Sequence, residues 1–337
     1  MPLGAKWDYF YWHNLKFSRL FNLAKNLLTK KEGYLNYFPR RYMIEPTTVC
    51  TLKCKHCFHY RYDKKIHFTY EHLSLENFLI ILKKIKKYAL LIELYNYGEP
   101  FLNKQTPFMI AASTRAGIRT RISSNMNVPM DDDYARSIVE AGLYRLTCSI
   151  DGHTQKIYEK YRENGNLALA LENSQKIISW KQKLKARYPR MVFRMLVFEW
   201  NYKYIKEAKA LATQYGFDEF CADPGAYTVN GQKVMWNIEK QCWQPGSSRF
   251  VNQNQTIQKN TKQPCEWLFN ALVINSNGNV LPCCFPYERK AEHLSLISNS
   301  LQEVWNSPEY QATRLYARGL QNDREHVLTA CKYCTRL

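Results

Sequence analysis

The sequence predicts an α/β protein in which a parallel sheet is covered by helices and followed by a small α+β region. Apolar strand-like segments and amphipathic helix-like segments alternate six times between about residues 40 and 225. Such alternation is typical of parallel strands joined by helices. At Pro264 the pattern changes, and Asn277-Gly278 between two apolar arms predicts a β-hairpin.

The elements follow in order from a first strand at about residue 41. Ser74 is a suitable N-cap for a helix whose expected buried side consists of Leu75, Phe78, Leu79, Leu82 and Ile85. The further strands are expected at Leu90–Tyr95, Ile118–Ser123, Leu143–Ile150, Met191–Phe198 and Phe217–Ala222, and the further helices at Pro107–Ala116, Asp132–Ala141, Leu167–Arg187, Lys203–Tyr215 and Asn299–Arg318. Ligands of such folds bind at the carboxyl ends of the strands.

Residues 1–39 precede this repeat and predict an amphipathic basic helix. Its apolar residues recur at helical spacing, with lysines and arginines between them: Phe17, Leu20, Phe21, Ala24, Leu27 and Leu28. We expect this stripe to pack on an open side of the protein's own domain, and contact with a membrane surface is the alternative. The chain then divides into the helical extension 1–39, the α/β region 40–225, a connector 226–263 with little regular structure, and the region 264–337.

Composition limits the class of protein. The 337 residues are 45% hydrophobic, without a transmembrane run or a signal-peptide pattern. Eleven cysteines in such a chain indicate metal ligands in a reducing compartment, so a cytoplasmic location is expected. The net charge of +19 favours anionic partners, or reflects a lysine-rich solvated surface. No nucleic-acid motif is present, and no nucleic-acid partner is expected.

Three cysteines directly after the first strand predict a metal site. Cys50, Cys54 and Cys57 are separated by three and then two residues. Three thiolates suit a [4Fe–4S] cluster in which one iron has no protein ligand and is open to a small molecule. A zinc knuckle is the alternative, although zinc sites usually combine two separated Cys/His pairs.

The Cys-x3-Cys-x2-Cys spacing, with the aromatic His56 inside it, resembles the radical S-adenosylmethionine (SAM) superfamily. The resemblance implies a partial (β/α)6 TIM-type barrel. It also implies that the open iron binds the amino and carboxylate groups of SAM, and that cleavage of SAM yields a 5′-deoxyadenosyl radical that removes hydrogen from a substrate.

The resemblance extends to residues that would contact SAM. Tyr97-Gly98-Glu99-Pro100 follows the second strand where the family has Gly-Gly-Glu-Pro, so Tyr97 replaces the first glycine. Further residues at strand ends match positions that hold SAM in the family. The expected SAM contacts are Tyr97, Gly98, Glu99, Pro100, Ser124, Asn125, Ser149, Asp151 and Arg162, with His56 beside the cluster. Arg162 would lie near the methionine carboxylate, and a surface arginine is the alternative.

The C-terminal cysteines resemble a second family signature. Cys265 is followed by twelve residues, Gly278, four more residues and Cys283, and Cys331 and Cys334 close the set. This resembles the start of a SPASM domain, with too few cysteines for two clusters. The resemblance is to the shortened twitch domain, especially that of a dehydrogenase of butirosin biosynthesis, with one auxiliary [4Fe–4S] cluster on Cys265, Cys283, Cys331 and Cys334. A zinc ribbon is the alternative.

Cys221 is the candidate catalytic residue outside the clusters. Phe220 and Ala222 alternate with it, so the apolar pair should face the helices and Cys221 the barrel interior. A thiol there could return a hydrogen atom to a substrate radical, as in radical SAM epimerases. A small buried residue is the alternative.

The resemblance implies a radical SAM enzyme that oxidises a polar, sugar-like or aminocyclitol-like small molecule, and the net charge of +19 favours one with anionic groups. The auxiliary cluster would accept the electron, and flavodoxin or ferredoxin would be the external reductant. The alternatives are an epimerase that uses Cys221, an enzyme that modifies a ribosomal peptide, and a metal-binding interaction protein without catalysis.

Overall fold

The computed structural model describes residues 16–57, 71–229, 232–237, 239–240, 242–245, 265–284, 294–320, 326–328 and 331. Within them, eight strands form one sheet in the order β11-β10-β1-β2-β3-β4-β5-β6. The strands are β1 Arg41–Ile44, β2 Leu91–Glu93, β3 Arg119–Ser124, β4 Arg145–Ser149, β5 Arg190–Val197, β6 Glu219–Pro224, β10 Ala271–Ile274 and β11 Val280–Leu281. All neighbours run parallel except β10 and β11, which form the expected hairpin.

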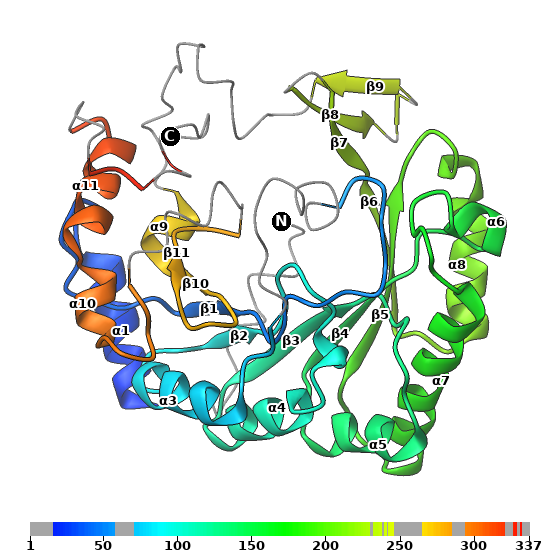
Figure 1. The fold of residues 1–337 in the computed structure, drawn as a ribbon, viewed down its shortest axis with the longest axis horizontal. Coiled ribbons are helices and arrows are strands. Elements are labelled where there is room, and N and C mark those ends of the chain that lie inside the picture. Colours follow the sequence, from blue (N-terminus) through cyan, green and yellow to red (C-terminus); the bar gives the residue numbers. More distant parts are fainter. Residues whose placement is uncertain are drawn as a thin grey trace.

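The sheet curves into an arc with helices on its outer side, and its two edges, β11 and β6, are not joined (Figure 1). This is the expected partial (β/α)6 barrel. The helices are α1 Phe17–Leu28, α3 Leu75–Ile85, α4 Thr106–Arg115, α5 Asp132–Glu140, α6 Gln155–Tyr158, α7 Leu167–Lys183, α8 Ile205–Gln214, α9 Glu266–Asn270, α10 Leu301–Trp305 and α11 Pro308–Ala317, with short 3-10 turns at Pro100–Leu102 and Tyr202–Tyr204. The Ser74 hydroxyl accepts from Asn77 N at 3.1 Å and caps α3 as predicted.

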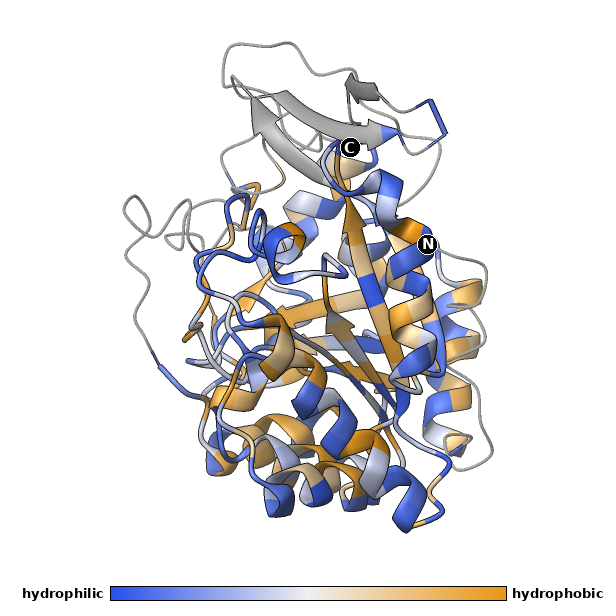
Figure 2. Ribbon diagram, turned by 90° about the vertical axis from the view of Figure 1, so that its right-hand side faces the viewer, coloured by the Kyte–Doolittle hydropathy of each residue, from blue (hydrophilic) through white to orange (hydrophobic). Residues whose placement is uncertain are grey.

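Strand alternation divides the sheet into an outer and a concave face. Ile122, Cys148 and Phe193 face the helices and belong to the main core. Figure 2 shows hydrophobic residues concentrated in the strands at the centre of the molecule, with hydrophilic and hydrophobic residues mixed along the helices around them. The concave face carries polar and charged side chains, and the carboxyl ends of β1 to β5 lead into the loops that hold the predicted site.

The C-terminal region continues the barrel sheet. β10 pairs in parallel with β1 over four residues, from Arg41 opposite Ala271 to Ile44 opposite Ile274. α10 and α11 cover the same end of the arc as α1 (Figure 1). The predicted boundary at residue 264 therefore separates two sequence regions that share one sheet.

Three expectations for individual elements are wrong. The connector contains a three-stranded antiparallel sheet of β7 Ala226–Val229, β8 Gln232–Asn237 and β9 Cys242–Pro245. Asn230-Gly231 between β7 and β8 is a typical hairpin signal that the prediction did not use. The single helix expected over Asn299–Arg318 is two helices, because Pro308 cannot continue α10 and instead begins α11, with Ser307 as N-cap.

The third error concerns α1. The helix forms, but its apolar stripe does not pack on the domain. Phe17 is 83% exposed and Leu28 is 87% exposed, whereas the polar residues Arg19, Asn22 and Asn26 are buried. The sequence pattern identified the apolar residues of the helix face correctly, but this face points to solvent and not to the protein core.

Candidate functional site

The loop that carries Cys50, Cys54 and Cys57 is held against the turn that follows β2. Glu99 N donates to Val49 O at 2.7 Å. A Cβ atom on Gly98 would lie 2.1 Å from Thr47 O and 2.8 Å from Val49 O. Only glycine allows the two backbones to approach this closely. The glycine and the cysteine loop thus form one packed unit.

Glu99 joins this unit to the end of β3. Its carboxylate accepts from Ser124 Oγ at 2.7 Å, from Asn125 N at 2.7 Å and from Phe101 N at 3.2 Å. Complete burial raises the pKa of Glu99 to about 7, and the same donors oppose that rise. The Ser124 hydroxyl also accepts from Met126 N. Ser124 is therefore engaged in holding Glu99 and the β3 end in place.

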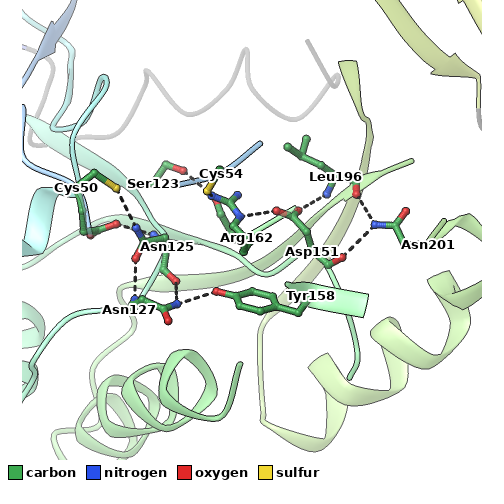
Figure 3. A network of polar contacts seen from close by, with 12 residues as sticks. Cys50, Cys54, Ser123, Asn125, Asn127, Asp151, Tyr158, Arg162, Leu196 and Asn201 are labelled. Carbon is green, nitrogen blue, oxygen red and sulfur yellow. Dashed lines mark hydrogen bonds and ion pairs between the residues drawn. The ribbon is translucent and has the colours of Figure 1, made fainter. Parts of the chain in front are cut away.

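Two donors approach the cysteine sulfurs. Asn125 Nδ2 lies 3.5 Å from Cys50 Sγ, and Arg162 Nη1 lies 3.6 Å from Cys54 Sγ (Figure 3). Burial raises the pKa of the Cys50 thiol to about 12 and also raises that of Cys54. A bound metal centre supplies the positive charge that favours the thiolate form.

Asp151, at the end of β4, organises the next part of the site. Arg162 Nε donates to Asp151 Oδ2 at 2.6 Å, and Leu196 N donates to Asp151 Oδ1 at 2.6 Å (Figure 3). Asn201 Nδ2 donates to Asp151 O at 3.0 Å. The Asp151 side chain is fully buried and that of Arg162 is 13% exposed, so this ion pair is largely shielded from water. Arg162 is part of the site and not a surface residue.

The segment that carries Arg162 is itself bound to the cysteine loop. Lys53 N donates to Glu163 O, and Lys55 N donates to Tyr161 O. The ring of His56 lies 6.2 Å from those of both Tyr161 and Phe198. The aromatic rings of Tyr161 and Phe198 therefore pack around the residues of the cysteine loop, including Cys57.

A second set of polar side chains lies on the concave face. Ser149 Oγ is 3.4 Å from Ser123 Oγ on the neighbouring strand. Cys221 Sγ donates to Asp223 Oδ1 at 3.4 Å, and Arg194 Nε donates to Asp223 Oδ2 at 2.7 Å. Phe220 and Ala222 pack against the main core, as the alternation predicted.

The second cysteine set lies at the end of the arc formed by β10 and β11, opposite the end formed by β6. Cys265 is the N-cap of α9, Cys283 follows β11, and Cys331 is buried. Cys283 and Cys331 both lie near Tyr310 on α11, whose hydroxyl donates to Leu281 O at 3.0 Å. Cys334 is outside the described residues.

Tyr97 connects the two cysteine sets. Its backbone N donates to the Glu45 carboxylate at 3.0 Å beside the first set, and its hydroxyl donates to Cys284 O at 3.0 Å next to the second. The residue that departs from the usual glycine therefore has a role of its own in this chain.

The thiols of the first set fit an iron–sulfur cluster. All three cysteines pack in one small apolar cluster with Leu52, Tyr161 and Phe198. No group of three or more His, Cys, Asp or Glu among the described residues is arranged around a single ion. A [4Fe–4S] cluster places each thiolate on a different iron and therefore needs a wider set of sulfurs than one ion does.

The structure brings most of the expected SAM residues together at the strand ends. The sequence did not single out Asn127, Tyr158 and Asn201. Asn127 Nδ2 donates to the Tyr158 hydroxyl at 2.7 Å, and Asn127 N donates to Asn125 Oδ1 (Figure 3). Asn127 could have been identified from the sequence, because it lies two residues after Asn125 in the same loop at the end of β3.

Comparisons with known proteins identify the families that this chain matches. A model of the radical SAM superfamily matches residues 44–212, and a model of an iron–sulfur cluster-binding domain, SPASM, matches residues 265–335. Fe-coproporphyrin III synthase of Methanosarcina barkeri is 32% identical over 116 residues, which are 34% of this chain and 28% of that relative. The match thus spans less than a third of the relative's length.

Solved structures with the same fold include three proteins bound to SAM. SuiB of Streptococcus suis has a TM-score of 0.61 and 16% identity, covering 88% of this chain and 72% of its own. BtrN in complex with AdoMet and 2-DOIA has a TM-score of 0.51 and 12% identity, covering 90% and 95%. anSMEcpe with bound AdoMet has a TM-score of 0.53 and 12% identity, covering 87% and 93%. At these identities the likeness shows the fold.

Proposed function

We propose that this chain, which belongs to the radical SAM superfamily and carries a SPASM/twitch domain, oxidises a polar substrate at a C–H bond. The cofactors of these domains are a [4Fe–4S] cluster, SAM and an auxiliary iron–sulfur cluster. Together they supply a 5′-deoxyadenosyl radical that removes hydrogen and an acceptor for the electron that oxidation releases. Cys50, Cys54 and Cys57 would hold the first cluster, and Cys265, Cys283, Cys331 and Cys334 the auxiliary one.

The observation that carries the proposal is the convergence of three strand ends on the cysteine loop. Glu99 follows β2, Asn125 follows β3 and Asp151 follows β4, and each is connected by hydrogen bonds to that loop or to Arg162. A site at the carboxyl ends of parallel strands is where this type of fold binds its ligands.

The same residues provide groups for binding SAM. The backbone of the Gly98 turn would accept the amino group, and the Arg162 guanidinium would attract the carboxylate. Asn125 and Ser149 would offer hydrogen bonds to the remaining polar groups, and Asp151, whose carboxylate accepts from Arg162 and Leu196 N, would orient Arg162 toward SAM. Because Glu99 is occupied by three protein donors, its role would be to fix the turn and the Asn125 backbone. Ser124 would support Glu99.

The concave face favours a polar substrate. Towards the carboxyl ends of the strands, Ser123 on β3 and Ser149 on β4 have their hydroxyls 3.4 Å apart, and Arg194 on β5 pairs with Asp223 on β6. This lining suits a ligand rich in hydroxyl or anionic groups and would reject an apolar one. The complex of BtrN with 2-DOIA is that of a relative in fold and leaves the substrate of this chain open.

Anaerobic reconstitution tests the proposal. The holoprotein should bind two clusters and, after reduction by flavodoxin, ferredoxin or dithionite, convert SAM to 5′-deoxyadenosine. Iron and sulfide content and chromatography of the products provide the measurement. A reconstituted protein with both clusters that never cleaves SAM would overturn the enzymatic function and leave a metal-binding interaction protein.

Epimerisation is the second candidate, and the contacts of Cys221 favour it. Hydrogen-atom transfer from a thiol requires an intact S–H bond. Burial, with the nearby Asp223 carboxylate, raises the pKa of the Cys221 thiol. Arg194, whose Nε donates to Asp223 Oδ2 at 2.7 Å, would orient that carboxylate. The thiol is therefore held protonated on the concave face, as a hydrogen donor must be. Transfer of its hydrogen atom would leave a thiyl radical, which one electron from the external reductant and one proton from solvent would return to the thiol.

Turnover in heavy water separates the two candidates. An epimerase would place one solvent deuterium on the product carbon, and a Cys221→Ser variant would abstract hydrogen without forming the epimer. A dehydrogenase would form a product lacking two hydrogens, with no deuterium at that carbon, and would retain its activity in Cys221→Ser. A substrate that proves to be a peptide would replace the small-molecule part of the proposal without changing this test.

A further inference from the structure

The outward side of α1 is an apolar surface on a basic protein. Five large apolar side chains of this helix are exposed, by between 44% and 87%: Phe17, Leu20, Phe21, Leu27 and Leu28. They lie at the i, i+3, i+4 spacing of one helix face. We call these five residues the α1 stripe.

The orientation of the stripe is fixed by the buried polar side of the helix. Arg19 is 1% exposed and donates to Lys86 O, Ala116 O and Gly117 O at 2.7–2.9 Å. Lys86 and Ala116 are the C-caps of α3 and α4, so the guanidinium meets the negative ends of two helix dipoles. Turning the stripe inward would break these bonds and leave helix-end carbonyls unsatisfied.

Two asparagines hold the rest of the helix in the same orientation. Asn22 Nδ2 donates to Phe38 O at 2.9 Å and Asn22 Oδ1 accepts from Phe38 N at 2.8 Å. Asn26 Nδ2 donates to Asn270 Oδ1 at 2.7 Å. The exposed stripe is thus a consequence of specific contacts along the whole length of α1.

The surroundings of the stripe are basic. Lys16 on α1's N-terminal side, Lys86 and Lys87 at the end of α3, and Arg115 at the end of α4 are exposed. The sequence contains no Asp or Glu in residues 16–31, 83–92 and 104–130, which supply α1 and these helix ends. Lys25 Nζ lies 4.7 Å from the centre of the Phe21 ring. An apolar stripe bordered by cations fits a surface that carries negative charge and has an apolar interior directly beneath it.

We propose that the α1 stripe inserts into the interface of a lipid bilayer containing anionic lipids, with α1 parallel to the membrane plane. Among the described residues every helix is too short or too polar to cross a bilayer, so the contact would be peripheral. The sequence before the helix is rich in aromatic residues, because residues 7–12 comprise two tryptophans, two tyrosines, a phenylalanine and Asp8. Trp and Tyr favour the membrane–water interface.

Co-sedimentation of the holoprotein with lipid vesicles tests this inference. The probes are vesicles of phosphatidylcholine alone and vesicles with about one-third phosphatidylglycerol. The protein should sediment with the anionic vesicles at low salt and be released as salt screens the basic rim. Phe17→Glu with Leu28→Glu should lower the partition coefficient roughly tenfold or more, because two charged groups would have to enter the interface.

The matched control is Leu184→Glu together with Leu320→Glu. Both leucines are exposed, by 40% and 58%, lie outside α1, and give the same change in net charge. These substitutions should leave vesicle binding within about twofold of the unmodified protein. SAM cleavage should be unchanged in all variants, because none of the four positions belongs to the cluster or SAM site.

Three results would overturn the inference. The first is no binding to anionic vesicles at low salt. The second is equal loss of binding in the stripe and control variants, which would assign the effect to total charge. The third is a concentration-dependent dimer that dissociates in the stripe variant without vesicle binding, which would make a second copy of the chain the occupant.

Discussion

The two cysteine sites are held in place in different ways. Around Cys50 and Cys54 the supports are hydrogen bonds: Glu99, Asn125, Asp151 and Arg162 connect the loop to three strand ends. Around the second set, Cys265 and Cys331 pack into the main core with Trp305 and Tyr310, and the hydrogen bonds that lie nearby come from the hydroxyls of Tyr310 and Tyr97 to the backbone of β11 and Cys284.

The difference corresponds to what each site has to do. A polar network positions donors and acceptors for a small ligand that must bind and leave. A packed site with four cysteines would leave no iron open and needs only a stable cage. The contacts around each site therefore suit its proposed role, which is radical formation at the first site and electron acceptance at the second.

Removing one set of cysteines at a time should give the largest effect. Cys50→Ala with Cys54→Ala and Cys57→Ala should abolish 5′-deoxyadenosine formation and lower the iron content by about half, because one of two clusters is lost. Cys265→Ala with Cys283→Ala should lower iron similarly while SAM cleavage continues. Iron analysis and chromatography measure both. If the second variant also fails to cleave SAM while it retains the first cluster, the two sites are not separable.

Breaking the buried ion pair should have the next largest effect. Asp151→Asn leaves the shielded Arg162 without its carboxylate, which we expect to lower the free energy of unfolding by about 3–5 kcal/mol. The exposed pair Arg136–Glu140 provides the control, since both side chains are nearly half exposed. Glu140→Gln should cost far less than Asp151→Asn, because water screens an exposed ion pair. Urea unfolding of both variants measures the difference, and equal costs would show that shielding is not what matters at Asp151.

The difference between local patterns and long-range contacts explains what could be predicted from the sequence. The first site was predictable because its cysteine spacing and Gly98-Glu99-Pro100 are local patterns, and Ser74 likewise marked the start of α3. The side of α1 was not predictable. Arg19 is buried because its acceptors are carbonyls 67 to 98 residues away, and no pattern within the helix reveals them. Pro308 was a local signal that could have divided α10 from α11.

Each site contains one glycine that a larger residue could not replace easily, so the two substitutions allow the backbone requirements of the sites to be compared. A Cβ on Gly98 would lie 2.1 Å from Thr47 O, whereas one on Gly278 would meet the side chain of Ile297 at 2.4 Å, at a φ of +85°. Gly98→Ala should destabilise by about 3 kcal/mol and release the first cluster, because backbone atoms cannot move aside easily. Gly278→Ala should cost about 1–2 kcal/mol and affect only the auxiliary cluster.

Unfolding curves and iron content, measured on both glycine variants, distinguish these outcomes. Loss of the auxiliary cluster in Gly98→Ala would mean that the two sites behave as one structural unit. Retention of both clusters in that variant would mean that the close approach at Thr47 is not required for the first site.

Tyr97 offers the smallest and most specific test, because it contacts both regions. Tyr97→Phe removes the donor to Cys284 O and should lower the free energy of unfolding by about 1 kcal/mol. In the variant that lacks Cys50, Cys54 and Cys57, only the auxiliary cluster remains, and there Tyr97→Phe should accelerate loss of iron to a chelator.

Tyr134→Phe is the matched control, since that hydroxyl donates to Phe101 O and Asn103 O near the first site. It should cost similar stability and leave the rate of iron loss unchanged. Equal rates in the two variants would show that Tyr97 supports only the first site, and the replacement of glycine by tyrosine would then need another reason.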